Sequence, residues 1–295
     1  MEKNEYNFFN EKNVSGFSFA LMIVLYVFIS FFGQLLAGAI FGYGTAYLAV
    51  CSTFSSISMA VVLACLLIKR KEKLITGLSV KPFKIKYLFC ALAISFGMLF
   101  GLGFLNDAVV KLFQKAGLNV SGISIPLDST LQFVIFSTVL AILPAVFEEC
   151  FFRSFMLGNL KNTRTLIAIL SVSICFALYH KSVAQFFYQV IYGAVLCLLF
   201  KRANSVIPCM IAHFLNNFVV LCFEYFKVSV NLYNPILIVS GLAVLILTVL
   251  FLILEQYRED KGKKKDGLIR NFWLPSALFG AIICVALLVG NLFGG

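Results

Sequence analysis

Residues 17–41 read FSFALMIVLYVFISFFGQLLAGAIF, a run without one charged side chain. A helix needs about 20 predominantly apolar residues to cross the hydrocarbon core of a bilayer, so this run predicts a spanning helix. Similar runs recur along the whole chain and leave no room for a large soluble domain. We predict an all-α polytopic transmembrane bundle of eight or nine spanning helices. The segments lie near residues 17–41, 47–68, 87–105, 131–155, 165–179, 183–200, 205–222, 235–254 and 272–290. We predict two main polar connections between them, residues 106–130 outside and residues 255–271 inside.

The composition supports a membrane protein. Of 295 residues, 61% are hydrophobic and 13% are charged, whereas a soluble domain has about 45–50% apolar and about 25% charged residues. Segments 165–179 and 183–200 are short and are separated only by Lys181 and Ser182, so either can be re-entrant. We expect no cleavable signal peptide, because the first apolar run is longer than the roughly 7–15 residues of a signal sequence.

The net charge of +11 follows from membrane topology. With a cytoplasmic N-terminus and nine spans, nineteen of the 24 lysines and arginines fall inside and four outside, which is the positive-inside pattern. We therefore expect no nucleic-acid partner and a protein of the plasma membrane. The lysine cluster at 261–265 is suited to anionic lipid headgroups. The four basic residues that fall on the outer side of the membrane are Lys111, Lys115, Lys181 and Lys227.

A few strongly polar residues interrupt the apolar segments, where each costs about 2.5–3.5 kcal/mol at a helix centre. Glu148, Glu149 and Arg153 lie in the fourth segment. The chain has two histidines, and both His180 and His213 lie within predicted helices. Histidine exchanges protons most readily near neutral pH. Confinement of both histidines to the bilayer, with the buried carboxylate pair, predicts a functional site.

Helical spacing assigns different environments to these side chains. Glu149 and Arg153 are four residues apart and can pair, whereas Glu148 lies about 100° around the helix from Glu149. His213 and Asn217 are also four apart and can reach one cavity.

Depth and a proline support one shared site. From the nearest basic residues on the expected cytoplasmic side, a rise of about 1.5 Å per residue puts Glu148, His180, His213 and Asn217 about 17–24 Å deep. Pro144, one turn before Glu148, predicts a kink that opens space.

A carboxylate, two imidazoles and an amide away from bulk water are suited to hydrolysis. A glutamate can take a proton from water as a general base, a histidine can orient that water, and histidine and asparagine can stabilise an oxyanion. The same groups can instead bind a divalent metal such as zinc, with Glu148, His180 and His213 as candidate ligands. The chain contains no HExxH motif, so the sequence favours metal only weakly.

Three motifs in order now carry a family resemblance: Glu148-Glu149-x-x-x-Arg153, Phe176-x-x-x-His180 and His213-x-x-x-Asn217. Over roughly residues 131–220 the chain resembles the CAAX protease and bacteriocin-processing family (CPBP, or Abi). The resemblance implies an intramembrane endopeptidase that acts on a membrane-associated peptide or protein. The resemblance is compatible with a metal-dependent or a glutamate-dependent peptidase, and we favour the glutamate-dependent mechanism.

The resemblance also implies roles for the residues. Glu148 would activate water with the help of His180, and His213 and Asn217 would stabilise the oxyanion. Glu149 and Arg153 would support the architecture as an ion pair. We expect a cytoplasmic tail at 1–16, transmembrane helices and loops at 17–130, the catalytic core at 131–222, and helices with a basic cytoplasmic loop at 223–295.

Two other classes of function remain open. The first is a non-enzymatic regulator or immunity factor that uses the same fold with a membrane-protein partner. The second is a proton-coupled transporter, because glutamate and histidine within a membrane also form proton relays. We see no internal symmetry of the kind that favours transport.

Overall fold

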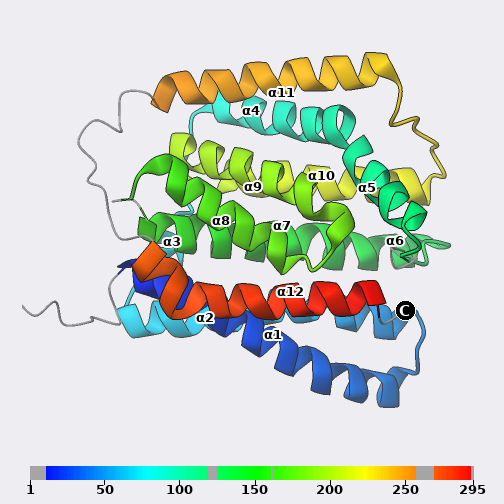
Figure 1. The fold of residues 1–295 in the computed structure, drawn as a ribbon, viewed down its shortest axis with the longest axis horizontal. Coiled ribbons are helices and arrows are strands. Elements are labelled where there is room, and N and C mark those ends of the chain that lie inside the picture. Colours follow the sequence, from blue (N-terminus) through cyan, green and yellow to red (C-terminus); the bar gives the residue numbers. More distant parts are fainter. Residues whose placement is uncertain (1–10, 119–124, 161–162, 257–268, 294–295) are drawn as a thin grey trace, which may run out of the picture.

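The computed structural model describes residues 11–118, 125–160, 163–256 and 269–293. Within these ranges the regular secondary structure is helical and includes no strand. Figure 1 shows the long helices running roughly side by side along one direction. The elements are α1 (Glu11–Phe41), α2 (Thr45–Arg70), α3 (Leu74–Gly77), α4 (Ile85–Phe96), η1 (Gly97–Gly101), α5 (Phe104–Lys115), α6 (Thr130–Ser137), η2 (Thr138–Ile142), α7 (Leu143–Glu148), η3 (Glu149–Leu157), η4 (Gly158–Leu160), α8 (Thr165–Tyr179), α9 (Val183–Ala203), α10 (Ile207–Tyr225), α11 (Pro235–Gln256), η5 (Ile269–Ala277) and α12 (Leu278–Phe293).

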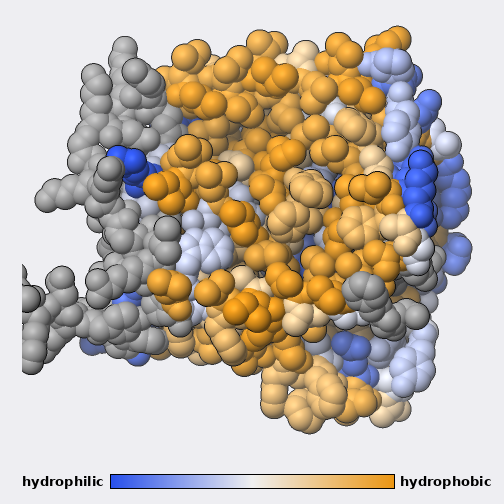
Figure 2. All heavy atoms as spheres, viewed as in Figure 1, coloured by the Kyte–Doolittle hydropathy of each residue, from blue (hydrophilic) through white to orange (hydrophobic). Residues whose placement is uncertain are grey.

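The helices are those of an integral membrane protein. Among the described residues, seven helical segments are long and apolar enough to span a bilayer, and the apolar helices Thr165–Tyr179 and Leu278–Leu292 are shorter. All nine predicted segments thus fall within helices, and two of them lack full spanning length. Hydrophobic residues dominate the middle of the face seen in Figure 2, and hydrophilic residues gather at its right-hand end.

The helices of the predicted site lie at the centre of the bundle. α8 packs along α9, and η3 contacts both of these helices, while α10 packs against α4, α7 and α9. α1 and α2 pack together on one side, and α11 covers α4 and η1 on the other (Figure 1). One large apolar cluster joins these layers, and within it Phe151, Phe152 and Phe176 are fully buried.

The predicted polar connection at 106–130 is partly wrong. Residues 104–115 are helical, so the third segment extends from Ile85 to Lys115, with a turn at Gly103 between η1 and α5. Asp107 and Lys111 form an ion pair of 2.6 Å one helical turn apart, and the Tyr233 hydroxyl donates to Asp107 at 2.6 Å. These contacts stabilise charged residues at the helix end, where hydropathy alone predicts a loop. The second predicted connection, 255–271, lies mostly outside the described residues.

Glycines allow α11 to approach the third segment closely. A Cβ built on Gly241 would meet the Gly101 nitrogen at 2.4 Å, and one built on Gly97 would meet Leu245 Cβ at 2.7 Å. Small residues at such crossings let membrane helices pack backbone to backbone. The GxxxG spacing of Gly97 and Gly101 is therefore a packing feature of the contact with α11.

Gly241→Ala is expected to lower the free energy of unfolding by about 1–3 kcal/mol, because overpacking forces the two backbones apart. Gly290→Ala is the matched control, since a Cβ there would meet nothing within 4 Å. Unfolding in detergent, followed by circular dichroism, measures both variants. Equal stability of the two would contradict the close crossing.

Candidate active site

The segment that carries the two glutamates is an interrupted helix. α6 begins with a capping box in which Ser129 accepts from the Gln132 backbone N–H at 3.3 Å and Gln132 accepts in return from Ser129 N–H at 3.0 Å. Two π-helical stretches, η2 and η3, then flank the short α7, which contains Pro144 and ends at Glu148. π-Helical turns are frequent at functional sites. In place of the simple kink predicted at Pro144, the structure has π-helical winding before and after α7.

Glu149 and Arg153 form the predicted pair. Arg153 Nη1 donates to Glu149 Oε1 at 2.9 Å, and both side chains are fully buried. The guanidinium also lies 4.1 Å from the ring centre of Phe176, a favourable cation–π distance. The pair is therefore enclosed in the protein core, within the one large apolar cluster.

His213, inside α10, lies between the two glutamates. Its Nδ1 is 2.7 Å from Glu149 Oε1, and its Nε2 is 3.9 Å from Glu148 Oε2. Glu149 Oε1 accepts from Arg153 and serves as the acceptor for His213 too, so Nδ1 is the donor and Nε2 faces Glu148. The two adjacent glutamates thus have different environments, as expected. Glu149 contacts Nδ1 of the His213 ring, and Glu148 faces Nε2 of the same ring.

His180 lies at the C-cap of α8, and not within the helix as the sequence predicted. Lys181 follows in the left-handed conformation with φ of 50°, and Ser182 caps α9 by accepting from Gln185 N–H at 3.4 Å. A tight turn therefore joins the two short helices. His180 Nδ1 lies 2.8 Å from the Phe176 carbonyl oxygen and must donate to it, so Nε2 is left with its lone pair.

A gap remains between Glu148 and the two imidazoles. Glu148 Oε2 lies 3.9 Å from His180 Nε2 and 3.9 Å from His213 Nε2. This oxygen is buried and has no hydrogen-bond partner. Polar contacts longer than about 3.5 Å are commonly bridged by water. A water molecule about 2.8 Å from each of two such atoms fits this separation.

Asn217 lies one turn along α10 from His213. Its Nδ2 donates to the Leu140 carbonyl at 3.0 Å, and its Oδ1 accepts from Asn216 Nδ2 at 3.4 Å. Pro144, four residues after Leu140, has no N–H to donate to that carbonyl. The structure thus brings Glu148, His180 and His213 together directly and connects Asn217 to the segment just before Glu148.

The residues fit zinc in chemistry but not in spacing. Zinc lies about 2.0–2.1 Å from each nitrogen or oxygen ligand, so two ligand atoms of a tetrahedral zinc are about 3.3 Å apart. Glu148 Oε2 is 3.9 Å from the Nε2 atom of either histidine. Within the described part of the chain, no three His, Cys, Asp or Glu side chains are grouped closely enough for a metal. The predicted ligand set Glu148, His180 and His213 is therefore not arranged for a metal ion.

Sequence reasoning missed two neighbours of the site. The buried Tyr179 side chain lies beside Glu148 and Ser55. Lys181, which the topology treats only as a loop lysine, has its Nζ 3.6 Å from the Tyr26 ring centre, and its charge acts on Glu148. Their positions next to His180 in the sequence were the available signal.

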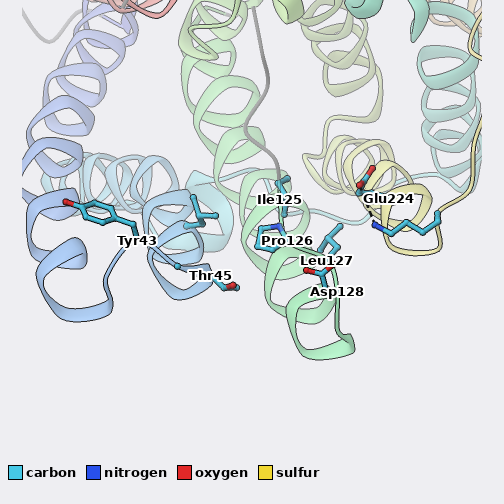
Figure 3. A pocket seen from close by; sticks show the side chains of 10 residues that line it. Tyr43, Thr45, Ile125, Pro126, Leu127, Asp128 and Glu224 are labelled. Atoms are coloured by element: carbon cyan, nitrogen blue, oxygen red, sulfur yellow. Dashed lines mark ion pairs between the residues drawn. The ribbon is translucent and has the colours of Figure 1, made fainter. Parts of the chain in front are cut away.

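A separate pocket of about 480 Å³ lies near the end of α10, as Figure 3 shows. It is formed by the α1–α2 turn, the segment before α6 and the last turn of α10. Glu224, in its lining, is seven residues from Asn217 and thus about 10 Å away along the helix. None of the predicted site residues lines this pocket. Its lining is Tyr43, Gly44, Thr45, Leu48, Ile125, Pro126, Leu127, Asp128, Glu224 and Lys227.

The fold and the buried cluster define a helical membrane protein with a carboxylate–imidazole site. Residues 130–219, which include all six predicted site residues, match the family model of the type II CAAX prenyl endopeptidases, Rce1-like. This match confirms the family resemblance for that part of the chain and implies a CAAX-type intramembrane endopeptidase. No curated protein matches the chain, and no solved structure matches it.

Proposed function

We propose that this protein is an intramembrane endopeptidase that hydrolyses a peptide bond of a membrane-associated peptide or protein with glutamate-activated water. One observation carries the proposal. Glu148 Oε2 is buried and without a hydrogen-bond partner, and two imidazole Nε2 atoms face it at 3.9 Å each. A buried carboxylate oxygen without a partner is costly in a folded protein, so its retention favours a reacting partner at that oxygen.

In this mechanism Glu148 and His180 hold the water. The unprotonated His180 Nε2 accepts one water hydrogen, and Glu148 accepts the other and removes it as the oxygen attacks the substrate carbonyl. The attack forms a tetrahedral oxyanion. When the C–N bond breaks, Glu148 returns the proton to the leaving amine, so the site ends in its starting protonation state.

His213 and Asn217 stabilise the oxyanion. His213 can donate from Nε2 only when its ring is protonated, because Nδ1 already donates to Glu149. The Glu149 carboxylate accepts from Nδ1 at 2.7 Å and thereby orients Nε2 toward Glu148. Glu149 is therefore a positioning residue for His213 as well as the partner of Arg153. This role exceeds the purely architectural one that the resemblance implies.

The test is digestion of a membrane-peptide library in liposomes by the wild type and by Glu148→Gln, with products read by mass spectrometry. We expect defined internal cleavages in the wild type, absence of these products in Glu148→Gln, and no effect of a metal chelator. The same cleavages in the Glu148→Gln digest would disprove the assigned base. Loss of cleavage with chelator, restored by zinc, would replace the proposal with a metal-dependent mechanism.

Glu149→Gln is expected to lower kcat by about 10- to 100-fold, in the range found when a side chain that orients a functional histidine is removed. Glutamine still accepts from His213 and Arg153, but a neutral amide oxygen is a weaker acceptor than a carboxylate and orients the His213 ring less firmly. Steady-state cleavage of one library product measures the effect. A kcat within 2-fold of wild type would restrict Glu149 to the structural role.

The proposal also covers location and organisation. The positive-inside pattern favours a cytoplasmic N-terminus in the plasma membrane. We assign the catalytic core to residues 131–222 and control of substrate access to the flanking helices in 17–130 and 223–295. Cysteine labelling of residue 12 and residue 227 in intact cells tests the orientation, with only the latter expected to react with an impermeant reagent.

A further inference from the structure

We propose that Tyr188 and Asn216 are positioning residues that orient the Asn217 amide toward the reacting carbonyl. This inference rests on the proposed function, in which Asn217 is an oxyanion donor. Neither residue belongs to the three sequence motifs.

The hydrogen bonds form a chain with one direction. The Tyr188 hydroxyl donates to Asn216 Oδ1 at 2.7 Å, and Asn216 Nδ2 donates to Asn217 Oδ1 at 3.4 Å. Asn217 Nδ2 then donates to the Leu140 carbonyl at 3.0 Å. The Leu140 carbonyl can only accept, so the Asn217 amide must present Nδ2 to it and Oδ1 to Asn216. The Asn216 amide must then present its own oxygen to Tyr188, and the Tyr188 hydroxyl satisfies that oxygen as a donor. We call this chain the amide relay.

The amide relay has a consequence for Asn217. An amide NH₂ group carries two hydrogens, and the bond to Leu140 uses one of them. The second remains for an oxyanion. If the amide were flipped, its oxygen would face the Leu140 carbonyl and the oxyanion, which are both acceptors, and repel them. The relay therefore favours the one orientation that can stabilise the transition state.

Burial makes the relay stiff. Tyr188 is 5% exposed and Asn216 is 7% exposed, so water competes little for their hydrogen bonds. Hydrogen bonds in a low-dielectric interior are stronger and reinforce one another along a chain. The relay also crosses three elements, since Tyr188 lies on α9, both asparagines on α10 and Leu140 in η2. It therefore connects the orientation of Asn217 to the packing of the helices around Glu148.

The test is a double-mutant cycle of Tyr188→Phe and Asn217→Ala, with kcat and KM measured on one cleaved peptide. Tyr188→Phe removes only the hydroxyl, and we expect kcat to fall about 3- to 10-fold with KM unchanged, the effect of one hydrogen bond. In the Asn217→Ala background the same substitution should change kcat less than 2-fold. Tyr87→Phe is the control, because its buried hydroxyl also donates, to Glu255 at 3.2 Å, on the other side of the bundle.

The outcomes separate the relay from the proposed function. A loss of kcat on Tyr188→Phe that is equally large with Ala at position 217 would overturn the relay, and so would a kcat within 2-fold of wild type. Failure of the proposed function appears instead as cleavage that persists in Glu148→Gln. The melting temperatures of the same four proteins form a cycle that needs no turnover. If the changes in melting temperature caused by Tyr188→Phe and Asn217→Ala were strictly additive in the double variant, the relay would also be overturned.

Discussion

Glu148→Gln is expected to lower kcat/KM by about 10²–10⁴-fold, the usual contribution of a positioned general base, while the protein stays as stable as wild type or becomes more stable. Glutamine has nearly the same shape and can still hold a water molecule, but it cannot take a proton from it. The stability expectation follows from burial. A carboxylate oxygen without a partner costs more to bury than a neutral amide, so we expect a gain of about 1 kcal/mol.

Two measurements check this prediction. Steady-state cleavage of one peptide gives kcat/KM, and thermal unfolding in the same detergent gives stability. Glu224→Gln is the matched control, since Glu224 is exposed and its pair with Lys227 spans 3.8 Å. A marked loss of stability in Glu148→Gln would mean that Glu148 is a structural residue, and the mechanism would lose its base.

Arg153→Met is expected to lower the free energy of unfolding by about 3–5 kcal/mol, the usual cost of removing one partner of a buried ion pair. Arg153 and Glu149 are both 0% exposed, so no solvent can replace the lost partner. Methionine retains much of the packing against Phe176 but leaves the Glu149 carboxylate uncompensated. Arg70→Met is the control. Arg70 is partly exposed, pairs with Glu72 at 3.8 Å and donates to Asn159 at 2.9 Å, so its loss leaves no buried charge and should cost less than the loss of Arg153.

A second substitution separates stability from activity. Glu149→Leu in the Arg153→Met background removes the remaining charge and should restore most of the stability, because a well-packed apolar pair often replaces a buried ion pair at no cost. It should not restore cleavage, since His213 Nδ1 then has no carboxylate partner. Chemical unfolding and peptide cleavage of the wild type, Arg153→Met and the double variant measure this. Recovery of both properties would show that Glu149 acts only through Arg153.

Apolar run length predicted the positions and order of the nine apolar segments, because spanning a bilayer requires a long apolar stretch. It overestimated how many reach spanning length, which is seven among the described residues. It failed where polar residues belong to a helix by pairing with each other. Asp107 and Lys111 illustrate this, since their contacts with one another and with Tyr233 are absent from any hydropathy profile. The short helices α8 and α12 show the opposite limit, since apolar composition does not fix spanning length.

Spacing predicted the Glu149–Arg153 contact, because side chains four residues apart share a helix face. It could not predict that His213 contacts Glu149, since the two residues are on different helices and the contact depends on how α10 packs. The predicted segment 165–179 ends where α8 ends, but spacing could not predict the tight turn after it, in which His180 caps the helix and Lys181 has a left-handed backbone. Contacts within one helix follow from the sequence, whereas contacts between helices need the tertiary arrangement.

The enclosed ion pair has a consequence for the proton content of the site. Arg153 and Glu149 cancel, so an ionised Glu148 leaves one uncompensated negative charge in a region of low dielectric. A single proton shared among Glu148, His180 and His213 would make the cluster neutral, and neutrality is strongly favoured there. Hydrolysis then only relocates protons within a cluster of constant total charge. The protein can thus carry out acid–base chemistry inside a membrane without drawing an ion into it.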